Sequence, residues 1–445
     1  MSSPVRYREA SATASESTQP MSEFNEHLID QLDIHLNDVN ADGSLSPGDR
    51  QATIVRLRKM ADGLEEPVHT IHRFAHLDLE KAMIQVGRDM GLFDALNETE
   101  KKLKIDEIAD KVSADPKLVE RMLRYYSTIN VVSEVGPRQF IANNVTENLT
   151  EDVCVAALDH FHGFVSKQYK AIPEFLRKNG YQNPGDEHDT AFQMAWKTTK
   201  KPFEIMPTVP DAMEDFHTYM RLRRPAHLSF LSVYPVLNQT AELRDHQRAL
   251  FVDIGGGDGH LGDEFQRKFS DIPGRIINED MPEALARRNP ASTIEHRAYD
   301  FTQPQPIIGA KFYHMRGVPH FLPPNRVHEL FVRIRKAMAA DSILLVDETM
   351  LPPTNVSLIA ASIDLTMMSA FASMERTREE WNDLAEGAGL DITQTYAYND
   401  LGHETVIEMR LAPHHLNPAE PVSPMKRRQT TISLVDRTKN KQMKE

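Results

Sequence analysis

From about residue 248 onward, short apolar segments alternate with amphipathic helical segments, and this alternation strongly constrains the fold. Residues 249–254 (ALFVDI) and 342–348 (SILLVDE) have the length and composition of strands buried on both faces. Residues 259–269 (GHLGDEFQRKF) have helical periodicity. Alternation of this kind forms a mostly parallel sheet with helices on both faces, so the sequence predicts an α/β fold. Its ligands bind beyond the carboxyl ends of the strands.

The segment before this region reads as short helices followed by a hairpin. Residues 71–96 predict one amphipathic helix closed by Gly91, and residues 104–130 predict two helices with helix-turn-helix spacing. Residues 131–144 (VVSEVGPRQFIANN) then predict the two strands of a wing. The second helix of the pair carries acidic as well as basic side chains, which is typical of a solvated face. A packing or dimer module is therefore favoured over DNA binding.

The composition excludes several classes of protein. The formal net charge of −14 argues against nucleic acid as a partner. No apolar run reaches the roughly 18 residues that span a bilayer, and the N-terminus lacks the apolar core of a secretory signal. The single cysteine, Cys154, excludes an internal disulfide and suits a reducing compartment. We therefore expect a cytoplasmic protein with no membrane partner and no metal.

The chain is predicted to have five parts. The first contains a candidate arm helix at residues 21–39, and the third is helical and rich in aromatic residues and methionine. In chain order, the parts are a disordered N-terminal region (1–50), a winged-helix-like dimerisation domain (51–150), a helical connector contributing to a substrate pocket (151–240), a Rossmann-like domain (241–412) and a basic, disordered tail (413–445).

A glycine loop follows the first strand of the Rossmann-like domain. It contains G-x-G-x-x-G at residues 257–262, which by itself suits either a dinucleotide or S-adenosylmethionine. Acidic residues near the ends of successive predicted strands favour S-adenosylmethionine over a dinucleotide. Asp253 would repel a pyrophosphate but suits an ammonium or a sulfonium, Asp280 suits ribose hydroxyls, and Asp300 suits the adenine amino group. The sequence therefore predicts S-adenosylmethionine as the cofactor.

Six motifs recur along the chain in the order and spacing of one known family. From about residue 60 to 411 the chain resembles the caffeic-acid-type O-methyltransferases, in particular the fungal ones of secondary metabolism. The motifs are VDIGGGDGH, NEDMP, YDF, HMRGVPH, LLVDETMLP and SMERTREEWNDLAEGAGL. The resemblance implies a homodimer built through the winged-helix-like domain, and a Rossmann-like domain that binds the cofactor. The residues that the resemblance assigns to the cofactor are Gly255, Gly257, Asp280, Asp300, Phe301 and Arg316. We add Asp253 because it lies at the end of the predicted strand before the glycine loop. Arg316 stands where many relatives have lysine.

The resemblance also implies the catalytic residues. A phenol with a pKa of about 10 is mostly neutral at pH 7, so methyl transfer to it is helped by a general base. His320 takes the place of that base, and Glu348 and Glu375 take the places of the carboxylates that orient it. The enzyme is therefore expected to methylate a hydroxyl of a small aromatic or polyketide-type metabolite.

One position departs from the family pattern. The family usually has His-Asp-Trp where this chain has His320-Phe321-Leu322, so an aspartate beside the base is lost. Two alternatives to methylation stay open. One is a pericyclase or dehydratase-like enzyme of polyketide or pyridone biosynthesis that binds S-adenosylmethionine without transferring its methyl group. The other is a non-catalytic partner subunit.

The predicted wall of the substrate pocket includes the helix at residues 358–374. Its methionines suit a flat aromatic guest, although the same spacing also fits plain core. The residues assigned to the pocket are Trp196, Phe321, Asp364, Met367, Met368 and Phe371.

Overall fold

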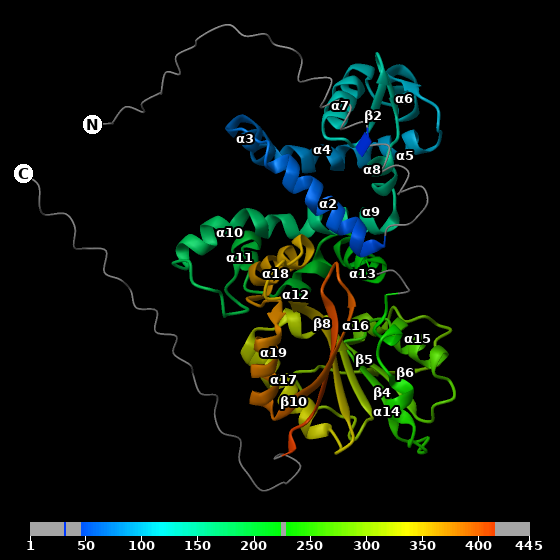
Figure 1. Ribbon diagram of the computed structural model, residues 1–445, viewed down its shortest axis with the longest axis vertical. Helices are drawn as coiled ribbons and strands as arrows, with labels where there is room; N and C mark the ends of the chain where they lie inside the picture. Colours follow the sequence, from blue (N-terminus) through cyan, green and yellow to red (C-terminus); the bar gives the residue numbers. More distant parts are fainter. Residues whose placement is uncertain (1–30, 33–45, 224–227, 414–445) are drawn as a thin grey trace, which may run out of the picture. The chain divides into compact units, whose positions relative to one another are not determined.

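The computed structural model describes residues 31–32, 46–223 and 228–413, and contacts divide the chain into two compact units, residues 1–69 and 70–445 (Figure 1). The first unit contains helix α2 (Pro47–Asp62) and the start of α3 (Pro67–Ala75). Helix α2 begins at Ser46, whose side chain accepts a hydrogen bond from the backbone N–H of Asp49. The predicted arm helix, apart from residues 31–32, and the predicted tail after residue 413 lie outside the described residues.

The second unit begins with the predicted helix-turn-helix and wing. Its elements are α4 (Leu77–Asp89), α5 (Leu92–Asn97), β1 (Leu103–Lys104), α6 (Ile105–Lys111), α7 (Pro116–Thr128), β2 (Ser133–Gly136), β3 (Gln139–Ile141) and α8 (Asn144–Asn148). Strands β2 and β3 form the wing, and β1 pairs with β3. The prediction of one helix over residues 71–96 is wrong. The helix is interrupted at His76, whose ψ of 8° is not helical, and at Gly91, whose φ is 66°.

A helical connector follows. It comprises α9 (Asp152–Asp159), the π-helical turn η1 (His160–Val165), α10 (Ser166–Lys178), α11 (Ala191–Trp196), α12 (Pro202–Ile205), η2 (Met206–Thr208), α13 (Ala212–Leu222), η3 (Phe230–Ser232) and α14 (Val236–Thr240). An ion pair between Arg88 and Asp159, 2.7 Å long, joins α4 to α9. The buried side chains of Phe164, Phe192 and Met206 form the centre of the connector's apolar cluster.

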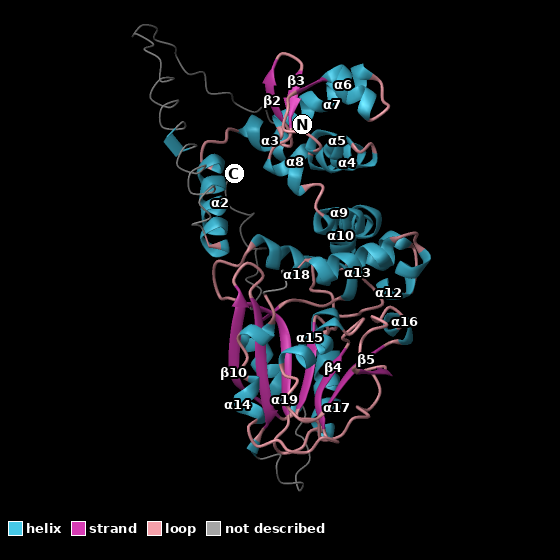
Figure 2. Cartoon of the chain, turned by 90° about the vertical axis from the view of Figure 1, so that its right-hand side faces the viewer, coloured by secondary structure: helices cyan, strands magenta, loops and turns pink. Residues whose placement is uncertain are grey.

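The predicted α/β sheet is confirmed, in the order β10-β11-β8-β7-β4-β5-β6 (Figure 2). Strands β8, β7, β4, β5 and β6 are parallel, whereas β10 and β11 are antiparallel, and β9 pairs with β8. The elements of this part are β4 (Ala249–Ile254), α15 (His260–Lys268), β5 (Arg275–Asp280), α16 (Pro282–Leu285), β6 (Glu295–Ala298), β7 (Phe312–Arg316), η4 (Pro319–Phe321), α17 (Pro324–Ala337), β8 (Ile343–Leu351), α18 (Leu358–Phe371), β9 (Arg376–Thr377), α19 (Arg378–Ala388), β10 (Leu390–Asn399) and β11 (Glu404–Leu411).

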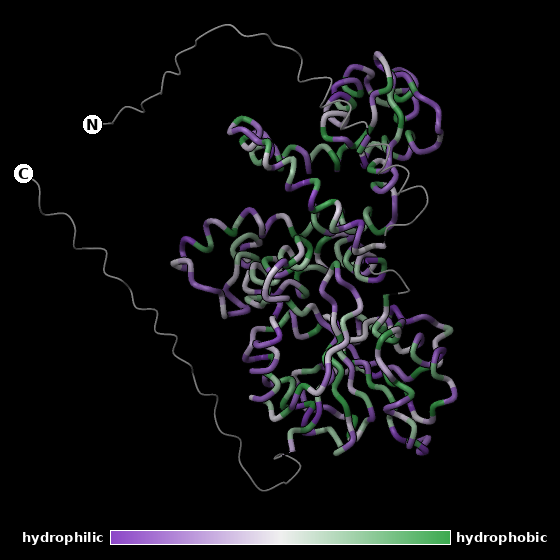
Figure 3. The backbone as a smooth tube through the Cα atoms, in the orientation of Figure 1, coloured by the Kyte–Doolittle hydropathy of each residue, from purple (hydrophilic) through white to green (hydrophobic). Residues whose placement is uncertain are grey.

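Helices cover both faces of this sheet because its central strands are apolar on both sides. In β8, Leu344 and Val346 join the core cluster that includes α17 and α19, whereas Ile343 and Leu345 join the cluster that includes α14 and α15. Figure 3 shows hydrophobic residues recurring along the strands. These strands form a rigid base from which the loops at their carboxyl ends emerge.

The chain order of the strands reverses between β4 and β7. Strand β5 lies on one side of β4 and β7 on the other, with Asp253 of β4 opposite His314 of β7. The loops after both strands therefore leave the same edge of the sheet, which is where ligands bind in folds of this type.

Candidate active site

The loop after β4 approaches its neighbours so closely that it requires glycine. A Cβ atom at position 256 would lie 2.2 Å from Oδ1 of Asn278 and 2.4 Å from Oδ2 of Asp253. Gly255 and Gly257 adopt φ angles of 73° and 60°, which favour glycine. The loop is thus pressed against the ends of β4 and β5, and its outer side lies open for a ligand.

Two of the predicted acids lie beside this loop, and one of them holds it by a hydrogen bond. Asp280 at the end of β5 accepts a hydrogen bond from the backbone N–H of Gly257, at 2.7 Å. Burial raises the pKa of Asp280. Asp253 is buried, its Oδ1 lies 2.7 Å from Nδ1 of His314, and its Oδ2 has no hydrogen-bond partner among the described residues.

These features fit S-adenosylmethionine better than a dinucleotide. A carboxylate with an unpartnered oxygen lies directly behind the glycine loop, and this negative charge favours a ligand with an ammonium and a sulfonium over one with phosphates. Asp300 and Phe301 follow β6. Asp300 is exposed, and the side chain of Phe301 packs against the core cluster that includes α17 and α19. Arg316 ends β7, with its Nε 3.8 Å from a carboxylate oxygen of Asp347.

The structure brings His320, Glu348 and Glu375 together although they are far apart in the sequence. His320 lies in η4 after β7, Glu348 is in β8, and Glu375 directly precedes β9. Nδ1 of His320 lies 2.9 Å from Oε1 of Glu375. The backbone N–H of His320 donates to Oε1 of Glu348 at 3.1 Å. All three side chains are buried, so one carboxylate orients the ring and the other holds the backbone behind it.

Burial and charge act in opposite directions on this cluster. Burial by itself lowers the pKa of His320, but the carboxylates of Glu348 and Glu375 outweigh it, so the pKa of the imidazole is raised. Burial raises the pKa of Glu348 to about 7. Three such ligand atoms within 4.8 Å of one another also match a metal-binding set. Nδ1 of His320, however, is engaged with Glu375. The absence of a metal requirement stays a prediction.

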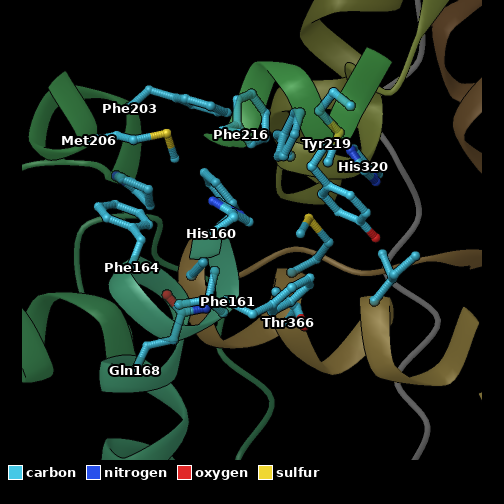
Figure 4. A pocket seen from close by; sticks show the side chains of 18 of the residues that line it. His160, Phe161, Phe164, Gln168, Phe203, Met206, Phe216, Tyr219, His320 and Thr366 are labelled. Atoms are coloured by element: carbon cyan, nitrogen blue, oxygen red, sulfur yellow. The ribbon is translucent and has the colours of Figure 1, made fainter. Parts of the chain in front are cut away.

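His320 lies on the wall of an apolar cavity between the connector and α18 (Figure 4). Aromatic side chains from the connector make up much of this wall. The lining residues include His160, Phe161, Phe164, Gln168, Phe203, Met206, Phe216, Tyr219, Met220, Arg223, His320, Phe321, Ile363, Thr366, Met367, Ala370 and Phe371. The ring of Phe321 forms edge-to-face contacts with the rings of Phe203 and Phe371, at 5.1 and 4.9 Å between ring centroids.

Three of the predicted pocket residues are on this wall and three are not. Phe321, Met367 and Phe371 line the cavity. Asp364 does not line the cavity. Its carboxylate accepts a hydrogen bond from the backbone N–H of Glu375 at 2.8 Å, and so supports the cluster of His320, Glu348 and Glu375.

The other two corrections concern Met368 and Trp196. Residues 363, 366, 367, 370 and 371 share one helical face of α18, whereas Met368 lies about 100° around the helix from Met367. Trp196 stands behind the wall, with its ring 5.0 Å from that of Phe164 and under the ammonium group of Lys167.

Sequence reasoning did not single out His160, Arg223 or Gln168 as site residues. The aromatic content of the connector indicated that some of its residues would line a pocket, but the one connector residue assigned to the pocket, Trp196, is not among the lining residues. These three polar residues belong to no motif. Only the packing of α13 against η1, and of α10 against η1 and α18, brings them to the cavity.

The fold and the site together define a Rossmann-like methyltransferase with an N-terminal helical module. A family model for the O-methyltransferase domain matches residues 185–391, and one for the O-methyltransferase dimerisation domain matches residues 79–152. Demethylsterigmatocystin 6-O-methyltransferase of Aspergillus parasiticus is 34% identical over 77% of this chain and 88% of its own. The chain belongs to the S-adenosylmethionine-dependent O-methyltransferases, and it is similar to those of fungal secondary metabolism.

The chain is also similar to a second curated relative, from Aspergillus flavus, and to solved structures. O-methyltransferase lepI is 32% identical over 77% of this chain and 89% of its own. The structure of LepI with S-adenosylmethionine superimposes with a TM-score of 0.80 at 29% identity, covering 87% of this chain and all of that one. A second structure with the same TM-score, identity and coverage is described as a pericyclic reaction enzyme. The predicted cofactor and fold class are confirmed, and no helix among the described residues is long and apolar enough to cross a membrane.

Proposed function

We propose that this enzyme methylates a phenolic hydroxyl of a small aromatic, polyketide-type metabolite, with His320 as the general base. The observation that carries the proposal is the 2.9 Å contact between His320 and Glu375 on the wall of an apolar, aromatic-lined cavity. The names of the relatives, among them the demethylsterigmatocystin enzyme, support a substrate of this class. The low cysteine content supports the cytoplasm as the place where the enzyme works.

In this proposal the chain's own residues prepare the acceptor oxygen. Nδ1 of His320 keeps its proton toward Glu375, which leaves Nε2 free to take the proton of the substrate hydroxyl. Glu348 fixes the backbone of His320, and Asp364 fixes that of Glu375. When bound, S-adenosylmethionine would supply a methyl group activated by its positively charged sulfur, whose carbon–sulfur bond would break as the bond to the acceptor oxygen forms, with S-adenosylhomocysteine as the leaving group. The aromatic wall excludes water and holds a flat ring against His320.

The likeness to LepI favours a second candidate, an enzyme that binds the cofactor without transferring its methyl group. Its support is Phe321, which replaces the aspartate usual in the family and makes the site beside His320 apolar. The catalytic cluster, with its two carboxylates intact, favours methylation. To decide, the enzyme is incubated with labelled S-adenosylmethionine and a panel of phenolic polyketides. A gain of one methyl group supports the proposal, and cyclised or dehydrated products without label support the second candidate.

We expect methyl transfer to be lost as the pH falls through a midpoint above the ordinary histidine value of about 6.5. The base must be neutral to accept a proton, and the two glutamates raise the pKa of His320, so the ring stays protonated to higher pH. Glu375→Gln removes one of these charges and should move the acid limb of kcat/KM to lower pH. Because Glu348 titrates in the same range, the limb describes the cluster and not one residue. An acid limb that does not move would exclude this electrostatic coupling.

We also propose that the enzyme is a homodimer built through the region of the dimerisation-domain match, residues 79–152, together with the helical residues directly before it. Large apolar side chains of α3 and α4, including Ile71 (61% exposed) and Phe74 (58%), face outward, which is typical of an interface. The double variant Ile71→Glu/Phe74→Glu is expected to be monomeric in sedimentation analysis. The control is Leu237→Glu, since Leu237 is also exposed but belongs to α14. A wild-type monomer, or a dimer that survives the double substitution, would contradict this interface.

A further inference from the structure

A second histidine lines the substrate cavity, apart from the catalytic cluster. His160 is only 7% exposed and lies among aromatic rings, with Phe216 at 5.4 Å and Phe161 at 5.5 Å between centroids. Figure 4 shows its ring among the side chains that surround the cavity. Its Nδ1 is buried and has no hydrogen-bond partner among the residues that the structure describes. A buried polar group without a partner destabilises a fold, so its presence requires an explanation.

Three other polar side chains on this wall, those of Gln168, Thr366 and His320, differ from that of His160 in having protein partners. The amide of Gln168 donates to the hydroxyl of Ser369 at 2.9 Å. The hydroxyl of Thr366 donates to the carbonyl oxygen of Ser362 at 2.7 Å. His320 is held by Glu375. His160 is thus placed to serve a group that arrives with the ligand.

The backbone around His160 is also unusual. Between α9 and α10 the chain makes a π-helical turn, η1, which begins at His160. Such turns are rare and frequently lie at functional sites, because the extra residue changes the direction of the side chains. Here the turn places His160, Phe161 and Phe164 on the cavity wall.

The chemistry of the ring indicates what it binds. Burial lowers the pKa of His160 to about 4, so the imidazole is neutral at working pH and carries one N–H donor. A buried donor that is left without a partner costs free energy, so this N–H favours a ligand group that accepts a hydrogen bond. In these apolar surroundings a carbonyl oxygen satisfies the donor and needs no further partner.

We propose that His160 donates a hydrogen bond to a carbonyl oxygen of the substrate, so that the enzyme selects aromatic ketones that carry the methylated hydroxyl at one end and the carbonyl away from it. This inference rests on the proposed function, because it assumes that the cavity beside His320 holds the substrate. His160 is then a specificity residue, separate from the base. Through this hydrogen bond the enzyme would bind phenols that also carry a carbonyl oxygen in preference to phenols that lack one.

Two matched pairs of probes test this proposal by calorimetry in the presence of S-adenosylhomocysteine. The pairs are 4-hydroxyacetophenone with 4-ethylphenol, and 6-acetyl-2-naphthol with 6-ethyl-2-naphthol, in which a carbonyl group replaces a methylene group. In at least one pair the ketone should bind the wild-type enzyme about tenfold more tightly. His160→Phe should abolish this preference, and His160→Gln, which keeps a donor, should retain much of it. His162→Phe, an exposed histidine of the same turn, should leave it unchanged.

Thermal unfolding separates a binding role from a structural one. Without ligand, His160→Phe should unfold at the same temperature as the wild type or higher, because it removes an unpartnered polar group. Equal binding within both pairs, no binding of any probe, or a preference that survives in His160→Phe would overturn the proposal. Failure of the base assignment gives a different pattern: His320→Ala would methylate normally while the ketone preference persists.

Discussion

Replacing His320 by alanine is expected to reduce methyl transfer about 100-fold or more while leaving the affinity for S-adenosylmethionine nearly unchanged. The substitution removes the group that we assign as the acceptor of the hydroxyl proton, whereas Glu375 and Glu348 are engaged with its ring and its backbone. The glycine loop and Asp280 are untouched, since they lie after β4 and at the end of β5. The measurement pairs single-turnover methyl transfer with calorimetric titration of the cofactor.

Two variants control for indirect effects of this change. His320→Gln keeps a donor toward Glu375 but provides no base, so it should be about as inactive as the alanine variant while avoiding an unpaired buried carboxylate. His188→Ala removes an exposed histidine of the connector region and should leave the rate unchanged. Normal turnover by both His320 variants would show that the base is assigned wrongly.

Replacing Asp280 by alanine is expected to have the reverse effect, with cofactor binding weakened about 10- to 100-fold. Its two carboxylate oxygens accept backbone N–H groups of Gly257 and Met281, at 2.7 and 2.6 Å, and so hold the loop in shape. The alanine variant loses both hydrogen bonds and the negative charge. At saturating cofactor, the rate of methyl transfer should stay within a few-fold of the wild type, because the His320 cluster is unchanged.

Calorimetric titration with S-adenosylmethionine and S-adenosylhomocysteine measures this loss. Asp271→Ala, which removes an exposed acid of the same domain, is the matched control and should bind both ligands normally. Unchanged affinity in Asp280→Ala would mean that the cofactor does not depend on this carboxylate, and it would remove the main support for reading the acids at the strand ends as a cofactor site.

Much of the fold could be predicted because its signal is local. Each strand of the parallel sheet is a short apolar run, and each helix has its own periodicity, so the alternation is visible without knowledge of any contact. The same holds for the glycine loop and for Asp253 and Asp280, whose positions near strand ends follow from counting residues. The break at His76 was missed because no proline or glycine marks it.

The cluster of His320, Glu348 and Glu375, in contrast, could not be predicted from local sequence patterns. His320 is 28 residues from Glu348 and 55 from Glu375, and only the family resemblance suggested that they meet. Their contact depends on the register of β7 against β8 and on the loop before β9, which are properties of the assembled sheet.

The sequence by itself therefore determined the class of fold, the kind of cofactor and the residue types of the site. Only the tertiary structure decided which side chains line the cavity. The helical period of α18 was readable, but its rotation about its own axis was not, so Met367 and Met368 were equivalent until the helix packed. His160 reaches the cavity through a π-helical turn. The rotation of a helix about its own axis is set by the packing of neighbouring elements, and no local pattern in the chain encodes it.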